Sequence, residues 1–96
     1  MLTGKQKRFL RALGTKIDPI FQVGKTGIND NMVNLIDDAL EARELVKVRV
    51  LQNCLLETKD VARELAIRTN SALVQVVGRN LLLYRRSIKK EKIELP

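Results

Sequence analysis

Apolar and polar positions repeat along the chain with two different periods, and each period predicts a different element. Residues 3–13 have apolar side chains at helical spacing and precede Gly14, a common helix-ending residue, so they predict a helix. After a loop that contains Pro19, residues 20–23 form a short apolar run that predicts a strand. The side of the first helix that we expect in the core consists of Phe9, Leu10 and Leu13.

A second helix is predicted to begin near residue 28 or 29, where Asn29 is suited to cap its first turn. Residues 45–51 then place a valine at every second position around Lys47 and Arg49, which is the period of a half-buried strand. The predicted apolar stripe of the helix consists of Ile28, Met32, Leu35, Ile36, Ala39 and Leu40. Its opposite side is expected to be solvated and carries Asp30, Asp37, Asp38 and Glu41.

A third helix is predicted from Thr58, its expected N-cap, to about Thr69, with Val61, Ala62 and Leu65 facing inward. Residues 72–78 and 81–86 predict two strands of an antiparallel hairpin with a tight connection around Gly78, Arg79 and Asn80. The charged tail after Ser87 is expected to fray. The order α-β-α-β-α-β-β predicts a layered α/β fold with a mixed sheet, and the length suits a single domain over residues 1–96.

Composition removes several classes of function. No apolar run approaches the ~20 residues of a membrane span, and the basic N-terminus lacks the apolar region of a signal peptide. With one cysteine, Cys54, and no histidine, the chain has no internal disulfide, no usual zinc site and no histidine for acid–base catalysis. We therefore expect the reducing cytoplasm, with no metal site and no membrane contact. We also expect a monomer with no catalytic residues, cofactor or small-molecule substrate, although composition alone does not establish these points.

The net charge of +7 favours a polyanionic partner, and the charges are segregated along the chain. Residues 1–16 carry five cations and no acid, residues 79–92 carry six cations and one acid, and acids gather between them. A solvated surface without a ligand usually mixes the two signs. We therefore expect one basic and one acidic face.

A lysine flanked by glycines occurs in Gly24-Lys25-Thr26-Gly27, between a predicted strand and a helix. A nucleotide-binding P-loop is excluded because it needs a glycine where Pro19 stands, and a dinucleotide fingerprint fails on spacing. A KH-like G-x-x-G loop fits: two glycines let a nucleic acid backbone come close, and the next helix starts with free N–H groups. The alternative is a plain strand-to-helix turn that needs a positive φ.

The three aromatic residues restrict how a nucleic acid could be bound. Phe9 and Phe21 are expected in the core, and Tyr84 is expected to be half exposed on the sheet. Base stacking on aromatic rings is therefore not expected to dominate. Backbone contacts favour structured RNA over a specific single-stranded sequence.

Four segments, "KQKRFLRALG", "FQVGKTGIND", "ALEARELVKVRV" and "VQVVGRNLLLYRR", resemble the CRM-domain family in its small bacterial, YhbY-like form. The resemblance covers nearly the whole chain and implies a mixed four-stranded sheet with helices, similar to the C-terminal domain of translation initiation factor three. It also implies RNA binding without catalysis. The implied partner is precursor ribosomal RNA of the large (50S) subunit, or the pre-50S particle, whose assembly the protein would assist.

The resemblance places the RNA-binding site at Gly24, Lys25, Thr26 and Gly27, with the basic side of the first helix nearby. That side carries Lys5, Lys7, Arg8 and Arg11. Further candidates, whose orientation the sequence leaves open, are Arg79, Arg85 and Arg86. The rival hypothesis is a protein–protein adaptor that docks on basic ribosomal proteins through Asp37, Asp38 and Glu41.

Overall fold

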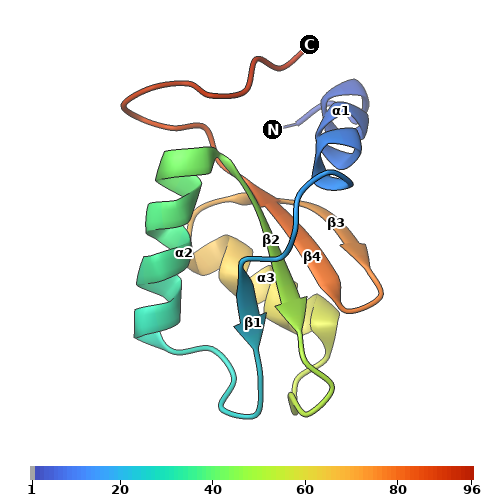
Figure 1. Cartoon of the computed structure of the whole chain (residues 1–96), viewed down its shortest axis with the longest axis vertical. Helices are drawn as coiled ribbons and strands as arrows, with labels where there is room; N and C mark the ends of the chain where they lie inside the picture. The colour runs from blue at the N-terminus through green and yellow to red at the C-terminus, as the bar shows by residue number, and fades with distance from the viewer. Residues whose placement is uncertain (1) are drawn as a thin grey trace.

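A computed structural model describes residues 2–96, and the predicted order of helices and strands is confirmed (Figure 1). The four strands form one sheet in the order β1-β2-β4-β3. β1 runs parallel to β2, whereas β4 is antiparallel to both of its neighbours, so the sheet is mixed as predicted. The elements are α1 (Gly4–Gly14), β1 (Phe21–Val23), α2 (Asp30–Arg43), β2 (Leu45–Val50), α3 (Thr58–Arg68), β3 (Ala72–Val77) and β4 (Asn80–Tyr84).

One face of the sheet is covered by α2 and α3, and the main hydrophobic core lies between these helices and the strands. The alternation in β2 has the predicted effect, because Val46, Val48 and Val50 are buried against these helices. Asn29 caps α2 as predicted, its side chain accepting a hydrogen bond from the Met32 amide at 2.8 Å. The first helical residue of α3 is Thr58 itself, so the prediction that Thr58 is the N-cap is wrong by one position.

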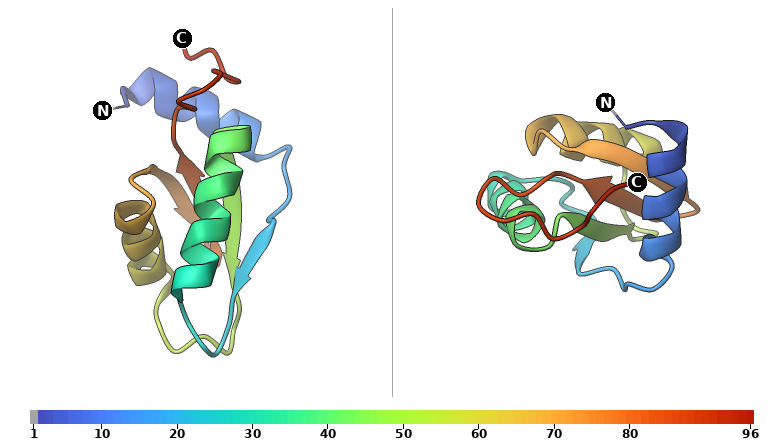
Figure 2. Two further views of the ribbon diagram at one scale, coloured as in Figure 1. Left: turned by 90° about the vertical axis from the view of Figure 1, so that its left-hand side faces the viewer. Right: turned by 90° about the horizontal axis from the view of Figure 1, so that it is seen from above.

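The opposite face of the sheet is covered at one end only, by α1 and the C-terminal tail (Figure 2). Leu10 of α1 packs in a second cluster with Leu45, Leu82 and Tyr84 of the strands. At the end of α1, a Cβ on Gly14 would lie 2.6 Å from the Leu82 side chain, so any larger residue there would force Leu82 to shift. Tyr84 is buried rather than half exposed, and burial raises the pKa of its hydroxyl.

Two helices are rotated from the orientation that their apolar residues predict. Phe9 is 37% exposed and Leu35 is 48% exposed, so the expectation that they pack in the core is wrong. Each precedes the central buried residue of its helix, Leu10 or Ile36, and therefore points about 100° away from it. In α2 the buried position is taken instead by Val33.

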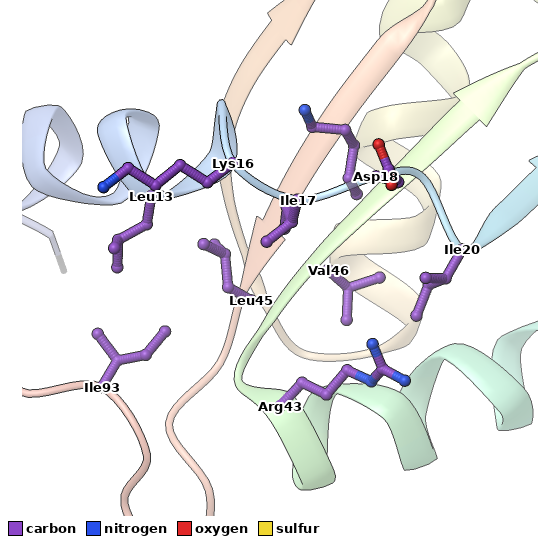
Figure 3. A pocket seen from close by; sticks show the side chains of 10 residues that line it. Leu13, Lys16, Ile17, Asp18, Ile20, Arg43, Leu45, Val46 and Ile93 are labelled. Carbon is purple, nitrogen blue, oxygen red and sulfur yellow. The ribbon is translucent and has the colours of Figure 1, made fainter.

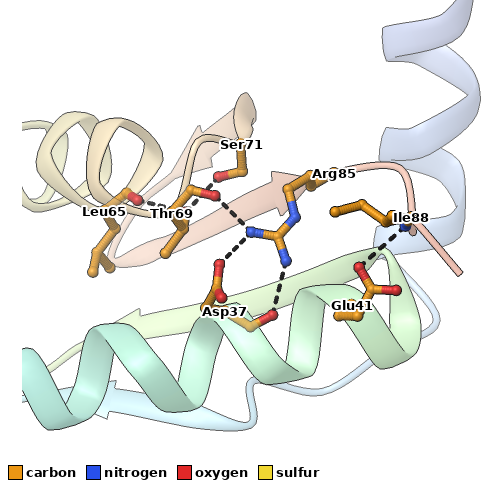
Figure 4. A network of polar contacts seen from close by, with 7 residues as sticks. All are labelled: Asp37, Glu41, Leu65, Thr69, Ser71, Arg85 and Ile88. Atoms are coloured by element: carbon orange, nitrogen blue, oxygen red, sulfur yellow. Dashed lines mark hydrogen bonds and ion pairs between the residues drawn. The ribbon is translucent and has the colours of Figure 1, made fainter.

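Two carboxylates near the end of α2 hold the tail, so the expectation that the tail frays is wrong. Glu44, which is fully buried, accepts hydrogen bonds from the amides of Ser87 (2.6 Å), Lys92 (2.6 Å) and Ile93 (2.5 Å). Glu41 accepts from the Ser87 hydroxyl and from two further tail amides, which lowers the pKa of its carboxyl to about 2 (Figure 4). The tail then packs Ile93 and Leu95 against the α1 cluster.

Candidate nucleic-acid interface

Gly24-Lys25-Thr26-Gly27 forms a tight turn between β1 and the start of α2. The Gly27 amide donates a hydrogen bond to the Gly24 carbonyl at 3.0 Å, and Gly27 has a φ of 71°, in the left-handed region that favours glycine. Lys25 and Thr26 are exposed at its tip, and their amides make no hydrogen bond to any residue of the range 2–96. The turn can therefore donate to an anion from both its backbone and its side chains.

Gly24 differs from Gly27 in a way that bears on function. Its φ lies outside the left-handed region, and a Cβ there would make ordinary contacts at 3.5 Å with the side chains of Asn53 and Leu51. The internal structure thus favours a glycine at Gly27 but not at Gly24.

Two other segments lie at the same end of the molecule as this turn (Figure 1). The 51–57 loop is held by the Leu51 amide, which donates to the Val23 carbonyl at 2.8 Å. The β3–β4 hairpin is held by the Val50 amide, which donates to the Arg79 carbonyl at 2.7 Å. Lys25 and Arg79 are both exposed, and within residues 2–96 neither forms an ion pair, so two free cations gather at this end.

The start of α2 is less available to an anion than the sequence suggests. The Asn29 side chain already occupies the Met32 amide, and Asp30 lies in the first turn, where it pairs with Arg68 of α3. A carboxylate at this position offsets the positive end of the helix dipole. The helix N-terminus behind the loop is therefore only partly open to an anion, and the turn offers the freer donors.

The basic side of α1 lies far from this turn, so the expectation that the two are neighbours is wrong. α1 is at one end of the long axis, which extends 37 Å, and the turn is at the other (Figure 1). Lys7 is half-buried, because it lies one helical turn before the buried Leu10. The cations exposed on α1 are Lys5, Arg8 and Arg11.

The three later arginine candidates have different surroundings. Arg79 is exposed in the hairpin, and Arg86 is exposed but pairs with Glu91 at 2.5 Å. Arg85 forms an ion pair with Asp37 and donates to the Thr69 carbonyl at 2.7 Å, and its side chain is only 18% exposed (Figure 4). Arg85 thus joins α2, the end of α3 and β4, a structural role that leaves its guanidinium little access to a ligand.

Lys47 and Arg49 are two cations that the sequence interpretation did not select. They lie on the face of β2 opposite the buried valines, where Arg49 is exposed and Lys47 is half-buried beside the end of α1. The register places Arg49 beside Gln22 of β1 and Asn80 of β4. The alternation in residues 45–51 was the signal that could have identified this polar, cationic part of the sheet.

A hollow of about 560 Å³ lies between the α1–β1 connection, the start of β2 and the tail (Figure 3). Its lining is mainly aliphatic, and the charged groups at its rim are Lys16, Asp18, Arg43 and Lys47.

Within residues 2–96 no three histidine, cysteine or acidic side chains are grouped in a way that could hold a metal ion. Over the same residues, no helix combines the length and the apolar character needed to cross a membrane.

The acidic face expected on α2 is partly used within the chain. Asp37 pairs with Arg85, and Glu41 binds the tail, which leaves Asp38 as the exposed carboxylate of this group that forms no ion pair within the described range. A docking surface for a basic protein would therefore have little free negative charge here.

The known proteins that this chain resembles have names or descriptions that refer to RNA binding or intron splicing. The B. subtilis protein named "Probable RNA-binding protein YqeI" is 56% identical over 96 residues, which cover all of both chains. A maize chloroplast protein named as a group IIA intron splicing facilitator is 30% identical over 88% of this chain, which spans 12% of that protein. The solution structure of a Staphylococcus aureus protein described as a candidate RNA-binding protein matches with a TM-score of 0.82 and 57% identity over all of both chains. The CRS1 / YhbY (CRM) domain matches residues 2–85, and the chain belongs to this family.

Proposed function

We propose that this protein binds RNA without catalysis and that residues 1–96 act as one RNA-binding unit. The observation that carries the proposal is the exposed Gly24–Gly27 turn, with its free amides and Lys25, in a chain whose relatives are named RNA-binding proteins. Phosphate oxygens are the acceptors that such a group of donors fits best, because a charge-assisted hydrogen bond is stronger than a neutral one.

The proposed contact begins at the turn and continues over the sheet. Lys25 pairs with a phosphate, the Thr26 hydroxyl and the loop amides donate to it, and Gly24 lets the sugar-phosphate backbone lie close. Arg79, the exposed strand cation Arg49 and the half-buried Lys47 extend the positive surface from there. The cations of α1 form a second contact region at the other end of the 37 Å long axis. An RNA that contacts both regions must span most of this length, so a segment of a few nucleotides is too short.

The expected partner is precursor ribosomal RNA of the large subunit, free or in pre-50S particles in the cytoplasm, whose assembly the protein assists. Support for this finer step comes from the family resemblance. Crosslinking in cells followed by sequencing of the attached RNA tests it directly. Recovery of large-subunit precursor segments is expected, and an unrelated set of RNAs would overturn this assignment while leaving RNA binding intact.

The role of the turn is tested with Lys25→Asp/Thr26→Asp, which changes the charge by −3 where phosphate is expected. The matched control is Ile88→Asp/Lys90→Asp, which changes the charge equally at two exposed tail positions. Affinity for large-subunit ribosomal RNA is measured by filter binding, and folding by circular dichroism. We expect binding to collapse in the loop variant only. Equal losses in the two folded variants would show a general effect of net charge and refute the proposed site.

Binding to the same ribosomal RNA without its proteins distinguishes the adaptor hypothesis from RNA binding. An adaptor that docks on a basic ribosomal protein loses its target when the proteins are removed, whereas an RNA-binding protein keeps it. The internal use of Asp37 and Glu41 makes the adaptor the weaker candidate.

A further inference from the structure

A cleft of about 290 Å³ lies between the Gly24–Gly27 turn and the 51–57 loop, and its walls have three different chemistries. Lys25 and Thr26 form a rim of donors. Its apolar lining comes from Ile28, Cys54, Leu55 and Leu56, and Glu64 of α3 supplies a carboxylate. A cation, an apolar surface and a hydrogen-bond acceptor therefore share one opening.

The apolar part of this opening extends onto the surface. Leu55 is 88% exposed and Leu56 is 45% exposed, although both neighbour a polar, cationic turn. The Leu56 side chain lies 4.0 Å from the position that a Cβ of Gly27 would occupy, so leucine and turn form one continuous wall. The exposure of two adjacent leucines to water is unfavourable, and an apolar ligand that covers them lowers the free energy.

We propose that this cleft holds one unpaired nucleotide of the bound RNA, an inference that rests on the RNA binding proposed above. The phosphate lies at Lys25 and Thr26, and the flat face of the base packs on Ile28 and Leu56. The base edge points to Glu64, whose carboxylate accepts a hydrogen bond from an exocyclic amino group. An amino-bearing base such as cytosine is then favoured over uracil, which offers a carbonyl at the same position.

The size of the cleft supports a single base. Pockets for whole small-molecule ligands are about 300–1,000 Å³, so 290 Å³ lies at the lower limit and suits one flat ring system. A base inside an A-form duplex keeps its faces stacked and cannot enter, whereas a base in a bulge or loop can. The inference is thus compatible with a structured RNA that presents one unstacked nucleotide.

The carboxylate is partly available for this contact. Glu64 uses one oxygen, Oε2, in its 3.3 Å pair with Arg68, and the side chain is 47% exposed. The other oxygen can accept from a base. A carboxylate also repels phosphate, so its presence beside Lys25 weakens general RNA binding and is useful only where an N–H donor reaches it.

The test uses three RNA hairpins with the same stem: one without a bulge, one with a single bulged cytidine and one with a single bulged uridine. Binding of the full chain to each labelled hairpin is measured by fluorescence anisotropy. We expect the cytidine bulge to raise affinity about 5-fold over the plain stem, as partial burial of one leucine and one base face allows. The uridine bulge is expected to give a smaller increase.

Two substitutions separate the walls of the cleft. Leu56→Ser should abolish the gain from either bulge and leave affinity for the plain stem unchanged, whereas the matched control Ile88→Ser, at a residue 90% exposed in the tail, should change nothing. Glu64→Gln should reduce the cytidine-to-uridine affinity ratio toward one, even if it raises affinity for all three hairpins by removing a negative charge.

Failure of this inference is distinguishable from failure of the proposed function. If the plain stem binds and depends on Lys25, but a bulge adds nothing or its gain survives Leu56→Ser, the cleft does not hold a nucleotide. Loss of plain-stem binding in Leu56→Ser would make the leucines part of a general surface and overturn the inference as well. If no hairpin binds to the wild-type chain, both proposals fall. Amide NMR spectra of each variant establish that it is folded.

Discussion

Alanine substitutions at the two loop glycines should separate folding from RNA binding. Gly27→Ala forces a side chain into a φ of 71°, which costs about 1–2 kcal/mol because the Cβ approaches the carbonyl oxygen. Gly24→Ala places its Cβ at ordinary contact distances of 3.5 Å outside the left-handed region, so the unfolding free energy should change by less than about 0.5 kcal/mol. The two variants carry the same added methyl group and are controls for each other.

Gly24→Ala should weaken RNA binding, although it hardly changes the free energy of unfolding. If a sugar-phosphate backbone lies against this residue, the methyl group holds it off and weakens at least one charge-assisted hydrogen bond. A loss of about 1.5 kcal/mol, or roughly 10-fold in Kd, follows from the energy of such a bond. Gly24→Ala should therefore keep its stability and lose affinity.

Thermal unfolding and anisotropy on the same preparations check both statements. For a chain of this size, 1 kcal/mol corresponds to about 4–8 °C in Tm, so the Gly27 variant should unfold measurably earlier than the Gly24 variant. Wild-type RNA affinity in a folded Gly24→Ala protein would refute the idea that a polynucleotide backbone approaches this position. An equal loss of Tm in both variants would refute the structural distinction between the glycines.

Three further predictions follow from the charges. If ~4–6 phosphates are engaged, the logarithm of the RNA association constant should fall with the logarithm of salt concentration at a slope of roughly −3 to −5, and a slope near zero would contradict an electrostatic interface. Glu44→Gln puts an NH₂ group against one of three tail amides and should lower the free energy of unfolding in urea by about 1–3 kcal/mol, while Glu94→Gln, at an exposed position, should not. The Glu41 carboxyl has a pKa of about 2 against an ordinary 4.5, so its stabilising contribution is complete above pH 4.5 and is lost as pH falls toward 2. NMR titration of the Ile88 and Lys89 amides should show their hydrogen bonds to Glu41 weakening in that window, and Glu41→Gln should remove this dependence.

Much of the candidate site could be located from the sequence because its signals are local. The G-x-x-G spacing marks a turn, and a turn needs only the residues that form it, as the hydrogen bond between Gly27 and Gly24 shows. The exposed leucines Leu55 and Leu56 carried no such signal, since two leucines in a sequence are equally compatible with a buried core and with an exposed surface. Their exposure depends on how the 51–57 loop passes beside the turn.

What the sequence by itself determined is the order of elements, the cap at Asn29 and the buried side of β2, because each depends on residues a few positions apart. What only the tertiary structure decided is how each helix is rotated and which distant charges meet. Phe9 is exposed because the sheet contacts α1 at Leu10, about 100° away around the helix. Arg85 pairs with Asp37, 48 positions away in the chain, and α1 with its cations lies at the opposite end of the molecule from the β1–α2 turn (Figure 1). Such pairings follow from packing in three dimensions, which leaves no period in the sequence.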